Sequence, residues 1–234
     1  MSIKNIFNGL NKNFNKAFTL SEVLITLGIV GVIAVLTIPA VVKDYKNKLY
    51  VAQLKKTYVQ IDDAISNIMS DEHATVFSET TAAATIAGKS NDFPDGKGAY
   101  YFLNNYFKTM KTGCNSTPND ANQCIAPAYA SIKGDASNLT GFGQYCVQLT
   151  SGAAVCMIKE VDNNIYIAVD VNGPAEPNIA GRDAFALKIE QNKLADWSND
   201  ADKCGTKISS FGHIGDYASG CVTKIINDGW TMKY

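Results

Sequence analysis

The 234-residue sequence lacks the features that would point to an enzyme or to a nucleic-acid-binding protein. It has 21 basic and 22 acidic residues, so the formal net charge is −1 and no basic surplus attracts a polyanion. There are only two histidines, His73 and His213, and neither belongs to a recognisable triad or zinc motif. No glycine-rich phosphate loop is present. We therefore expect no enzymatic activity, no nucleic-acid partner and no organic cofactor.

Charge is also nearly absent from one long stretch near the start of the chain. Between Phe18 and Val42 the only charged residue is Glu22, and most of the other residues are apolar. A segment of this length can cross a hydrocarbon core as a helix. A carboxylate inside such a span costs about 2.5–3.5 kcal/mol on insertion scales, so we interpret Glu22 as functional. A suitable partner is the amino group that cleavage between Ala17 and Phe18 would create.

These residues resemble the N-terminal segment of type IV pilins and type II secretion pseudopilins. The likeness rests on a run that follows a lysine and precedes an apolar helix interrupted at Pro39, namely Ala17-Phe18-Thr19-Leu20-Ser21-Glu22. Ala17 stands where glycine is commoner, and alanine is an accepted variant. The resemblance implies cleavage after Ala17 by prepilin peptidase and methylation of the new Phe18 amine by the same enzyme. It also implies assembly of a filament in which Glu22 pairs with the Phe18 amine of a neighbouring subunit.

Two other interpretations of the apolar stretch stay open, a secretory signal peptide and a plain membrane anchor. The apolar run is longer than the usual 7–15 residues of a signal peptide and carries an acid at its front. No small-x-small cleavage site follows the run. A plain anchor would not require Glu22. The alternative function is accordingly a membrane-anchored periplasmic binding or catalytic domain with a non-cleaved N-terminal helix.

The chain divides into four predicted parts. Residues 1–17 form a leader that is removed, and its three lysines and lack of acids hold that end in the cytoplasm. Residues 18–42 form the transmembrane or filament-core helix, and residues 43–70 form its amphipathic exported half. Residues 71–234 form a disulfide-bonded periplasmic or extracellular head. We expect a single-pass inner-membrane protein that later enters a pilus, a pseudopilus or the cell surface.

One helix is predicted from Phe18 to about Ser70, bent or loosened at Pro39. Apolar residues past Pro39 recur three and four positions apart, on one helical face: Leu54, Tyr58, Ile61, Ile65 and Ile68. Such a helix is about 80 Å long, which no single small domain can cover. The first half therefore needs lipid or a bundle of like helices. Its small residues, Gly28, Gly31 and Ala34, allow close helix packing or reflect the frequency of glycine in membrane helices.

The expected partners follow from the resemblance. They are copies of the chain, other pilins or pseudopilins, prepilin peptidase, the inner-membrane assembly platform and membrane lipid. The sequence does not distinguish a pilus subunit from a secretion pseudopilin.

All six cysteines lie between Cys114 and Cys221, downstream of the apolar stretch. That placement indicates an oxidising compartment and up to three disulfides. No pair has the two-residue spacing of a metal-binding knuckle. Many pairings are possible, and our working expectation is the sequential one: Cys114–Cys124, Cys146–Cys156 and Cys204–Cys221.

The head is predicted to complete an α+β pilin fold, with the long helix on an antiparallel sheet. We expect a loop over 71–90, an amphipathic helix within 97–112, and strands over 144–149, 153–159, 164–171, 183–190 and 193–197. Cys146 and Cys156 are equidistant from Ser151, so they can face each other across a hairpin.

One segment of the head carries a cluster of oxygen-bearing side chains. Asp170, Asn172 and Asp183 stand in a stretch similar to the Asp-x-Asn-Gly…Gly-x-Asp-x-Phe segment of many pseudopilin-like heads. Such hard oxygens suit Ca²⁺. Alternatively, Asn172-Gly173 and the nearby prolines only form a tight connection between two strands. Both interpretations stay open, and under either the loop orders the head and does not catalyse.

Overall fold

The computed structural model describes residues 18–83, 97–141, 145–159 and 164–234. The chain divides into two compact units, Met1–Asp44 and Tyr45–Tyr234. Helix α1 (Leu20–Asp71) begins in the first unit and ends in the second. It agrees with the predicted helix to within two residues at each end, and it continues through Pro39.

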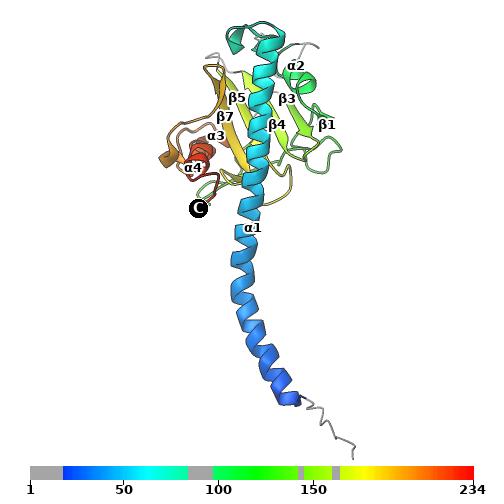
Figure 1. Cartoon of the computed structure of the whole chain (residues 1–234), viewed down its shortest axis with the longest axis vertical. Helices are drawn as coiled ribbons and strands as arrows, with labels where there is room; N and C mark the ends of the chain where they lie inside the picture. The colour runs from blue at the N-terminus through cyan, green and yellow to red at the C-terminus, as the bar shows by residue number, and fades with distance from the viewer. Residues whose placement is uncertain (1–17, 84–96, 142–144, 160–163) are drawn as a thin grey trace, which may run out of the picture. The chain divides into compact units, whose positions relative to one another are not determined.

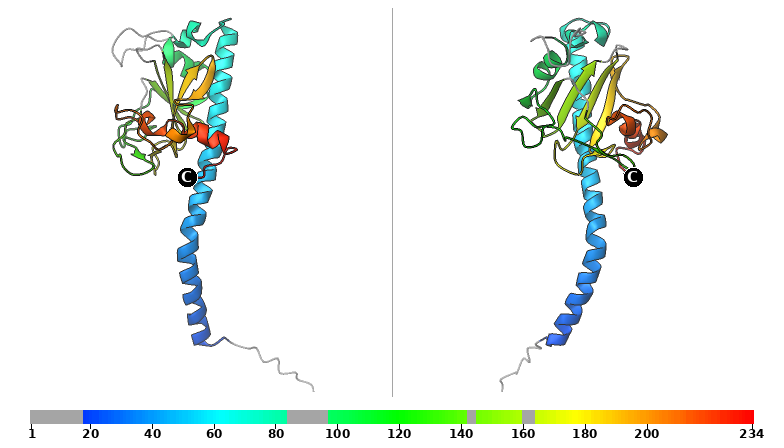
Figure 2. Two further views of the ribbon diagram at one scale, coloured as in Figure 1. Left: turned by 90° about the vertical axis from the view of Figure 1, so that its left-hand side faces the viewer. Right: turned by 180° about the vertical axis from the view of Figure 1, so that it is seen from behind.

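The second unit is an α+β fold in which the second half of α1 lies on a mixed sheet of eight strands (Figures 1 and 2). The strand order is β1-β3-β4-β5-β7-β6-β2, and β8 also pairs with β7. The antiparallel strands are β1 (Thr109–Thr112), β3 (Tyr145–Leu149), β4 (Ala154–Lys159), β5 (Ile165–Asp170), β7 (Ala184–Glu190) and β8 (Lys193–Asp196).

Two short strands make the sheet mixed, β2 (Ala130–Ser131) and β6 (Ile179–Ala180). They pair parallel to each other, and β6 pairs parallel to β7. The six longer strands form the antiparallel sheet that was expected, and the two short parallel strands are an addition that the sequence analysis did not predict. Strands of only two residues, such as β2 and β6, are too short to show an alternating pattern. Their pairing with each other, far apart in the sequence, therefore leaves no local signal.

Helices and turns fill the connections. They are the 3₁₀ turns η1 (Phe77–Glu79), η2 (Thr81–Ala83) and η3 (Ala201–Lys203), and the helices α2 (Gly98–Asn105), α3 (Gly215–Ala218) and α4 (Cys221–Asn227). The helix expected within 97–112 is α2, but the chain turns into the edge strand β1 at Thr109. Of the loop expected over 71–90, residues 84–90 lie outside the described part.

Successive side chains on a strand point to opposite faces of the sheet, and both faces of this sheet are apolar. On β5, Ile165, Ile167 and Val169 join the core under α1, whereas Ala168 joins a second cluster on the opposite face. The α1 side of the core contains Leu54, Ile61, Ile65 and Ile68, all fully buried, with Tyr58 packed against it. The predicted helix face is thus confirmed. The second cluster contains small residues on the strands, covered by Tyr129, Leu139, Ile214 and Tyr217.

Candidate functional site

The candidate assembly segment begins with a capped helix end. Thr19 precedes Leu20, the first residue of α1. The Thr19 N–H and hydroxyl donate to Glu22 Oε2 at 2.9 and 2.8 Å, and the Glu22 N–H donates to Thr19 Oγ1 at 3.2 Å. This reciprocal pair is a capping box. Sequence reasoning missed this role of Glu22, although the Thr-x-x-Glu spacing signals it.

The capping box gives Glu22 a role that does not depend on assembly. A plain anchor was expected not to require this acid, but any helix that starts at Leu20 gains from the cap. Glu22 therefore does not by itself separate an assembly helix from an anchor. Both hydrogen bonds that the Glu22 carboxylate accepts from Thr19 engage Oε2. Ala17, the predicted processing residue, and the rest of the leader lie outside the described residues.

The first half of α1 exposes large apolar side chains around its circumference. Its most apolar window has a mean hydropathy of 2.6, and none of that window is buried. In the described residues α1 is the one helix long and apolar enough to cross a membrane, a test that a signal sequence also passes. The exposed residues include Leu20, Leu24, Ile25, Leu27, Val30, Val32, Ile33, Val35, Leu36 and Val41.

Two glycines interrupt this apolar surface. A methyl group added at Gly28 or Gly31 would meet no heavy atom within 4 Å. The two glycines lie in a shallow apolar groove between larger side chains, lined by Leu27, Gly28, Gly31, Val32, Val35 and Leu36. Neither glycine is required by the isolated helix, and glycine within a helix is destabilising relative to alanine by about 0.5–1 kcal/mol. The groove is a surface that an apolar helix can fit closely.

Three disulfides staple the head, in the sequential pairing that was expected. Cys114 pairs with Cys124, Cys146 with Cys156, and Cys204 with Cys221. Cys146 and Cys156 are direct partners in the β3–β4 register, which is the cross-hairpin position predicted from their spacing. The chain has no free cysteine, so no thiol nucleophile is present.

The loop between β5 and β7 brings together the residues predicted for calcium. Asp170 Oδ2 accepts a hydrogen bond from the Tyr129 hydroxyl at 2.7 Å, and its Oδ1 accepts from the Asn172 N–H at 3.3 Å. Asp183 accepts from the backbone N–H groups of Asn178 and Ile179 at 2.8 and 2.6 Å. Both carboxyl groups are therefore hydrogen-bonded at each oxygen by protein donors.

The electrostatics of this loop disfavour charge on its two acids. Burial raises the pKa of Asp170 well above its usual range, despite the Tyr129 hydrogen bond. Burial also raises the pKa of Asp183 to about 6. Calcium prefers ionised, accessible carboxylates. These contacts match the alternative of a hydrogen-bonded connection, with Asp170 and Asp183 ordering the loop.

Two oxygens in the same loop lack such partners. Asn172 donates to the Ala175 carbonyl at 2.5 Å, but Asn172 Oδ1 and Asn178 Oδ1 are buried without a hydrogen-bond partner among the described residues. The described residues contain no group of three or more His, Cys, Asp and Glu side chains placed to hold a metal ion. The calcium site stays a prediction.

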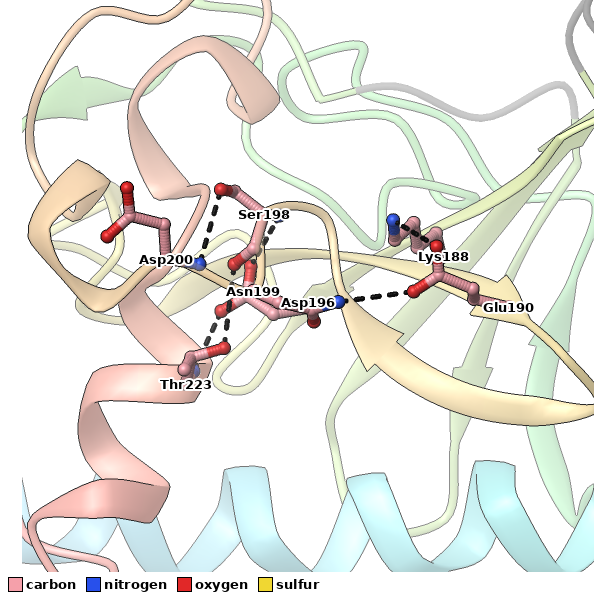
Figure 3. A network of polar contacts seen from close by, with 7 residues as sticks. All are labelled: Lys188, Glu190, Asp196, Ser198, Asn199, Asp200 and Thr223. Carbon is pink, nitrogen blue, oxygen red and sulfur yellow. Dashed lines mark hydrogen bonds and ion pairs between the residues drawn. The ribbon is translucent and has the colours of Figure 1, made fainter.

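A third buried acid, Asp196, connects the end of β8 to α4 (Figure 3). Its Oδ1 accepts from the Gly220 N–H and its Oδ2 from the Thr223 N–H, both at 2.8 Å. Asp196 thus supplies acceptors for the first N–H groups of α4 from 24 residues away. Next to it, Asn199 and Lys188 both bond Glu190, at 3.1 and 2.9 Å. Sequence reasoning missed Asp196 because no local spacing relates it to α4.

The two histidines have different surroundings. His73 is exposed just after the end of α1. His213 lies next to the buried Asp216, with 3.7 Å between Nδ1 and Oδ1, and the aromatic rings of Trp197 and Phe211 flank it.

Comparison of the chain with protein-family models, with curated proteins and with solved structures found no match.

Proposed function

We propose that the chain is a structural subunit, a pilin or pseudopilin, of a type IV pilus-like or type II secretion filament. The observation that carries this proposal is the first half of α1, which exposes apolar side chains all round directly behind Phe18-Thr19-Leu20-Ser21-Glu22. Such a helix is stable only in lipid or against other apolar helices. The membrane supplies lipid before assembly, and a filament core supplies the other apolar helices after it.

Assembly in this proposal uses both the apolar surface and Glu22. The groove at Gly28 and Gly31 receives a helix of a neighbouring copy, where close approach of backbones gives van der Waals contact. Glu22 keeps its capping bonds through Oε2 and pairs with the Phe18 amine of the neighbour. Breaking one partner of a charge pair in an apolar core is expensive, so the pair fixes the axial offset between copies. Pro39 removes one backbone donor and allows the helix to adjust.

Processing creates that amine. Prepilin peptidase cuts after Ala17 on the cytoplasmic face, where the leader lysines hold this end, and methylates Phe18. The head is exported to the periplasm, where its three disulfides form. An inner-membrane assembly platform then moves the subunit from lipid into a pilus or pseudopilus. The head has a structural role and is not an enzyme.

The second candidate is a membrane-anchored periplasmic domain whose helix is never cleaved. The capping box favours it to the extent that Glu22 has a use in any helix that starts at Leu20. This candidate predicts a full-length chain that stays monomeric in membranes and tolerates Glu22→Gln, which keeps the capping acceptor.

The first test is the intact mass and N-terminal sequence of the protein from membranes and from sheared surface material. We expect a chain that starts at N-methylated Phe18. Its presence in the sheared fraction assigns a surface filament, and its restriction to the membrane fraction assigns a pseudopilus. A chain that starts at Met1, or beyond Ala40, contradicts the proposal.

A second test separates the charge of Glu22 from its cap. Glu22→Gln retains an acceptor for the Thr19 N–H, because glutamine also serves at this position of a capping box, but it removes the charge. We expect normal processing and loss of polymer. Thr19→Ser keeps the capping oxygen and is the matched control, with polymer retained. Full polymer yield from Glu22→Gln contradicts the charge pair. It does not affect the test of processing, which is read separately from the mass and the N-terminal sequence.

A further inference from the structure

Three lysines follow the apolar stretch within six residues of α1. Lys43, Lys46 and Lys48 are exposed, and the only acid among them is Asp44. None of the three lysines forms an ion pair with a described residue. They cover about 7.5 Å of helix axis and point to different sides of the helix. We call these three residues the lysine collar, and together with Asp44 they leave a surplus of positive charge.

The lysine collar lies where the predicted membrane span ends. Val23–Val42 contains no charged residue. Its 20 residues cover about 30 Å as a helix, which is the thickness of a hydrocarbon core. Lys43 is therefore the first residue at the level of the lipid headgroups. Tyr45, between the lysines, is 67% exposed, and tyrosine is enriched at membrane interfaces.

Lysines on this side of the span run against the usual distribution. Basic residues are normally in excess in the cytoplasmic segments of membrane proteins. The leader, on that side, carries three lysines, and the collar carries as many on the side of the disulfide-bonded head. The collar therefore does not help to orient the chain, and its charge points to another use.

The charges of the head at the same level leave this surplus in place. The chain ends beside α1, near the end of the head at which α1 enters the second unit (Figures 1 and 2). The Tyr234 hydroxyl donates to the Gly181 carbonyl at 2.7 Å, so Arg182, the one arginine of the chain, lies at this end too. Burial raises the pKa of Tyr50 on α1, and the nearby Arg182 guanidinium opposes that rise. Arg182 has no ion pair among the described residues and offsets the terminal carboxylate.

We propose that the lysine collar binds the phosphate groups of anionic phospholipids on the exported face of the membrane. This inference rests on the proposed function in one respect, that the apolar half of α1 crosses a membrane. A lysine stem can lie along apolar surface while its ammonium group reaches a phosphate. Each basic residue at an anionic membrane surface adds about fivefold in affinity.

Headgroup binding gives the collar a role before assembly. Glu22 lies about 31 Å from Lys43 along the helix axis, which is the thickness of the hydrocarbon core. A collar held at the exported interface therefore holds Glu22 and the Phe18 amine at the opposite interface. That is the cytoplasmic face, where the proposed cleavage and methylation take place.

The test is the lipid that the full chain selects from a mixed bilayer. The chain is reconstituted in nanodiscs with equal amounts of dioleoyl-phosphatidylcholine and dioleoyl-phosphatidylglycerol, and the lipids that stay bound on release are counted by native mass spectrometry. We expect the wild type to retain phosphatidylglycerol in about fivefold excess or more. The triple variant Lys43→Gln, Lys46→Gln, Lys48→Gln is expected to lose that excess.

The matched control removes the same charge from the far end of the head. It replaces three exposed lysines by glutamine: Lys97, Lys108 and Lys193. These positions lie around the end of α1, where Tyr106 bonds Asp71, Asn192 bonds the Thr75 carbonyl, and α2 begins nearby (Figure 1). We expect this control to retain the full excess. The leader is common to all variants, so the contribution of its lysines cancels.

A second variant keeps the test independent of folding. Replacing all three collar lysines by arginine preserves the charge and is expected to preserve the excess of phosphatidylglycerol. Loss of the excess in this variant, or an equal loss in the control, overturns the collar. The same follows if the wild type shows no excess, or if the glutamine variant retains it in full.

The outcomes also separate the collar from the proposed function. A wild-type chain that enters the nanodiscs without selecting phosphatidylglycerol overturns only the collar. A chain that does not enter the bilayer overturns the collar and the proposed function together. A chain that selects phosphatidylglycerol but starts at Met1 in cells supports the collar and contradicts the proposed filament subunit.

Discussion

The two halves of α1 both carry many apolar side chains, but the surroundings of those side chains differ. From Leu20 to Asp44 the large side chains are exposed, whereas from Tyr45 to Asp71 one stripe is buried against the sheet. Ile33 is 55% exposed, and Ile61 is fully buried. The second half is stabilised by packing within its own unit, whereas the large side chains of the first half stay exposed in the described residues. The difference separates residues that stabilise the head from residues that, under our proposal, serve assembly.

The sharpest test of this difference makes the same substitution, isoleucine to alanine, once in each half. We expect Ile61→Ala to lower the free energy of unfolding of the head by about 2–5 kcal/mol, because it leaves a cavity in the core. Ile33→Ala should leave that free energy unchanged. The measurement is urea unfolding of the full chain in detergent, followed by the fluorescence of Trp197 and Trp230, which both lie in the head. Equal losses from both variants would mean that the halves are not independent.

The covalent links provide a second contrast, because all three disulfides lie in the head. Replacing Cys204 and Cys221 together by alanine removes a link that closes a loop of 17 residues. We expect the head to lose about 3 kcal/mol of stability in the same unfolding measurement. Helix content of the first half, followed by circular dichroism in detergent, should not change. A stable head without this disulfide would show that Asp196 and the core alone hold α4.

Two hydrogen bonds link the second half of α1 to Leu194 of β8, and the shorter comes from the Tyr58 hydroxyl. Tyr58→Phe removes the donor to the Leu194 carbonyl and is expected to cost about 1–2 kcal/mol of head stability. The matched change in the first half is Thr37→Val, since the Thr37 hydroxyl bonds only within its own helix, to the Ile33 carbonyl at 3.0 Å. We expect no change in head stability from Thr37→Val. A neutral Tyr58→Phe would show that the Tyr58 hydrogen bond adds nothing to the docking of α1.

The smallest expected effect is a pH dependence confined to the head. Burial raises the pKa of Asp183 to about 6, and it also raises the pKa of Asp196. At these two groups the folded head holds more protons than the unfolded chain, so their contribution to stability rises as the pH falls from 7 toward 5. For Asp183 we expect a gain of about 1 kcal/mol between pH 7 and pH 5, and a flatter profile in Asp183→Asn.

The same unfolding measurement tests the predicted calcium site. At pH 7 the unfolding midpoint of the head is measured once with EDTA and once with CaCl₂. A higher unfolding midpoint in CaCl₂, lost in Asp183→Asn, would establish a cation at the loop. Identical midpoints would leave Asp170 and Asp183 as hydrogen-bonding residues only. Stability that falls between pH 7 and pH 5 would contradict the raised pKa of Asp183.

Local patterns in the sequence were sufficient for the features whose partners lie close together along the chain. The 3-and-4 spacing from Leu54 to Ile68 identified the buried helix face, and the alternation around Ser151 identified the β3–β4 hairpin and its disulfide. In each case the residues are related by a helix turn or a strand repeat, so the backbone geometry itself carries the information. Even the Thr19–Glu22 capping box was readable, although it was missed.

Tertiary contacts decided the features that join distant segments. The parallel pairing of β2 with β6, the Tyr129–Asp170 hydrogen bond 41 residues apart, and the capping of α4 by Asp196 have no periodic signature. Strand type at β1 was also set by its neighbour, since Thr109–Thr112 pairs with β3 where helical spacing would have continued α2. Pairing with β3 outweighs the helical preference of this segment, because strand type depends on cross-strand neighbours as well as on propensity differences of about 1 kcal/mol.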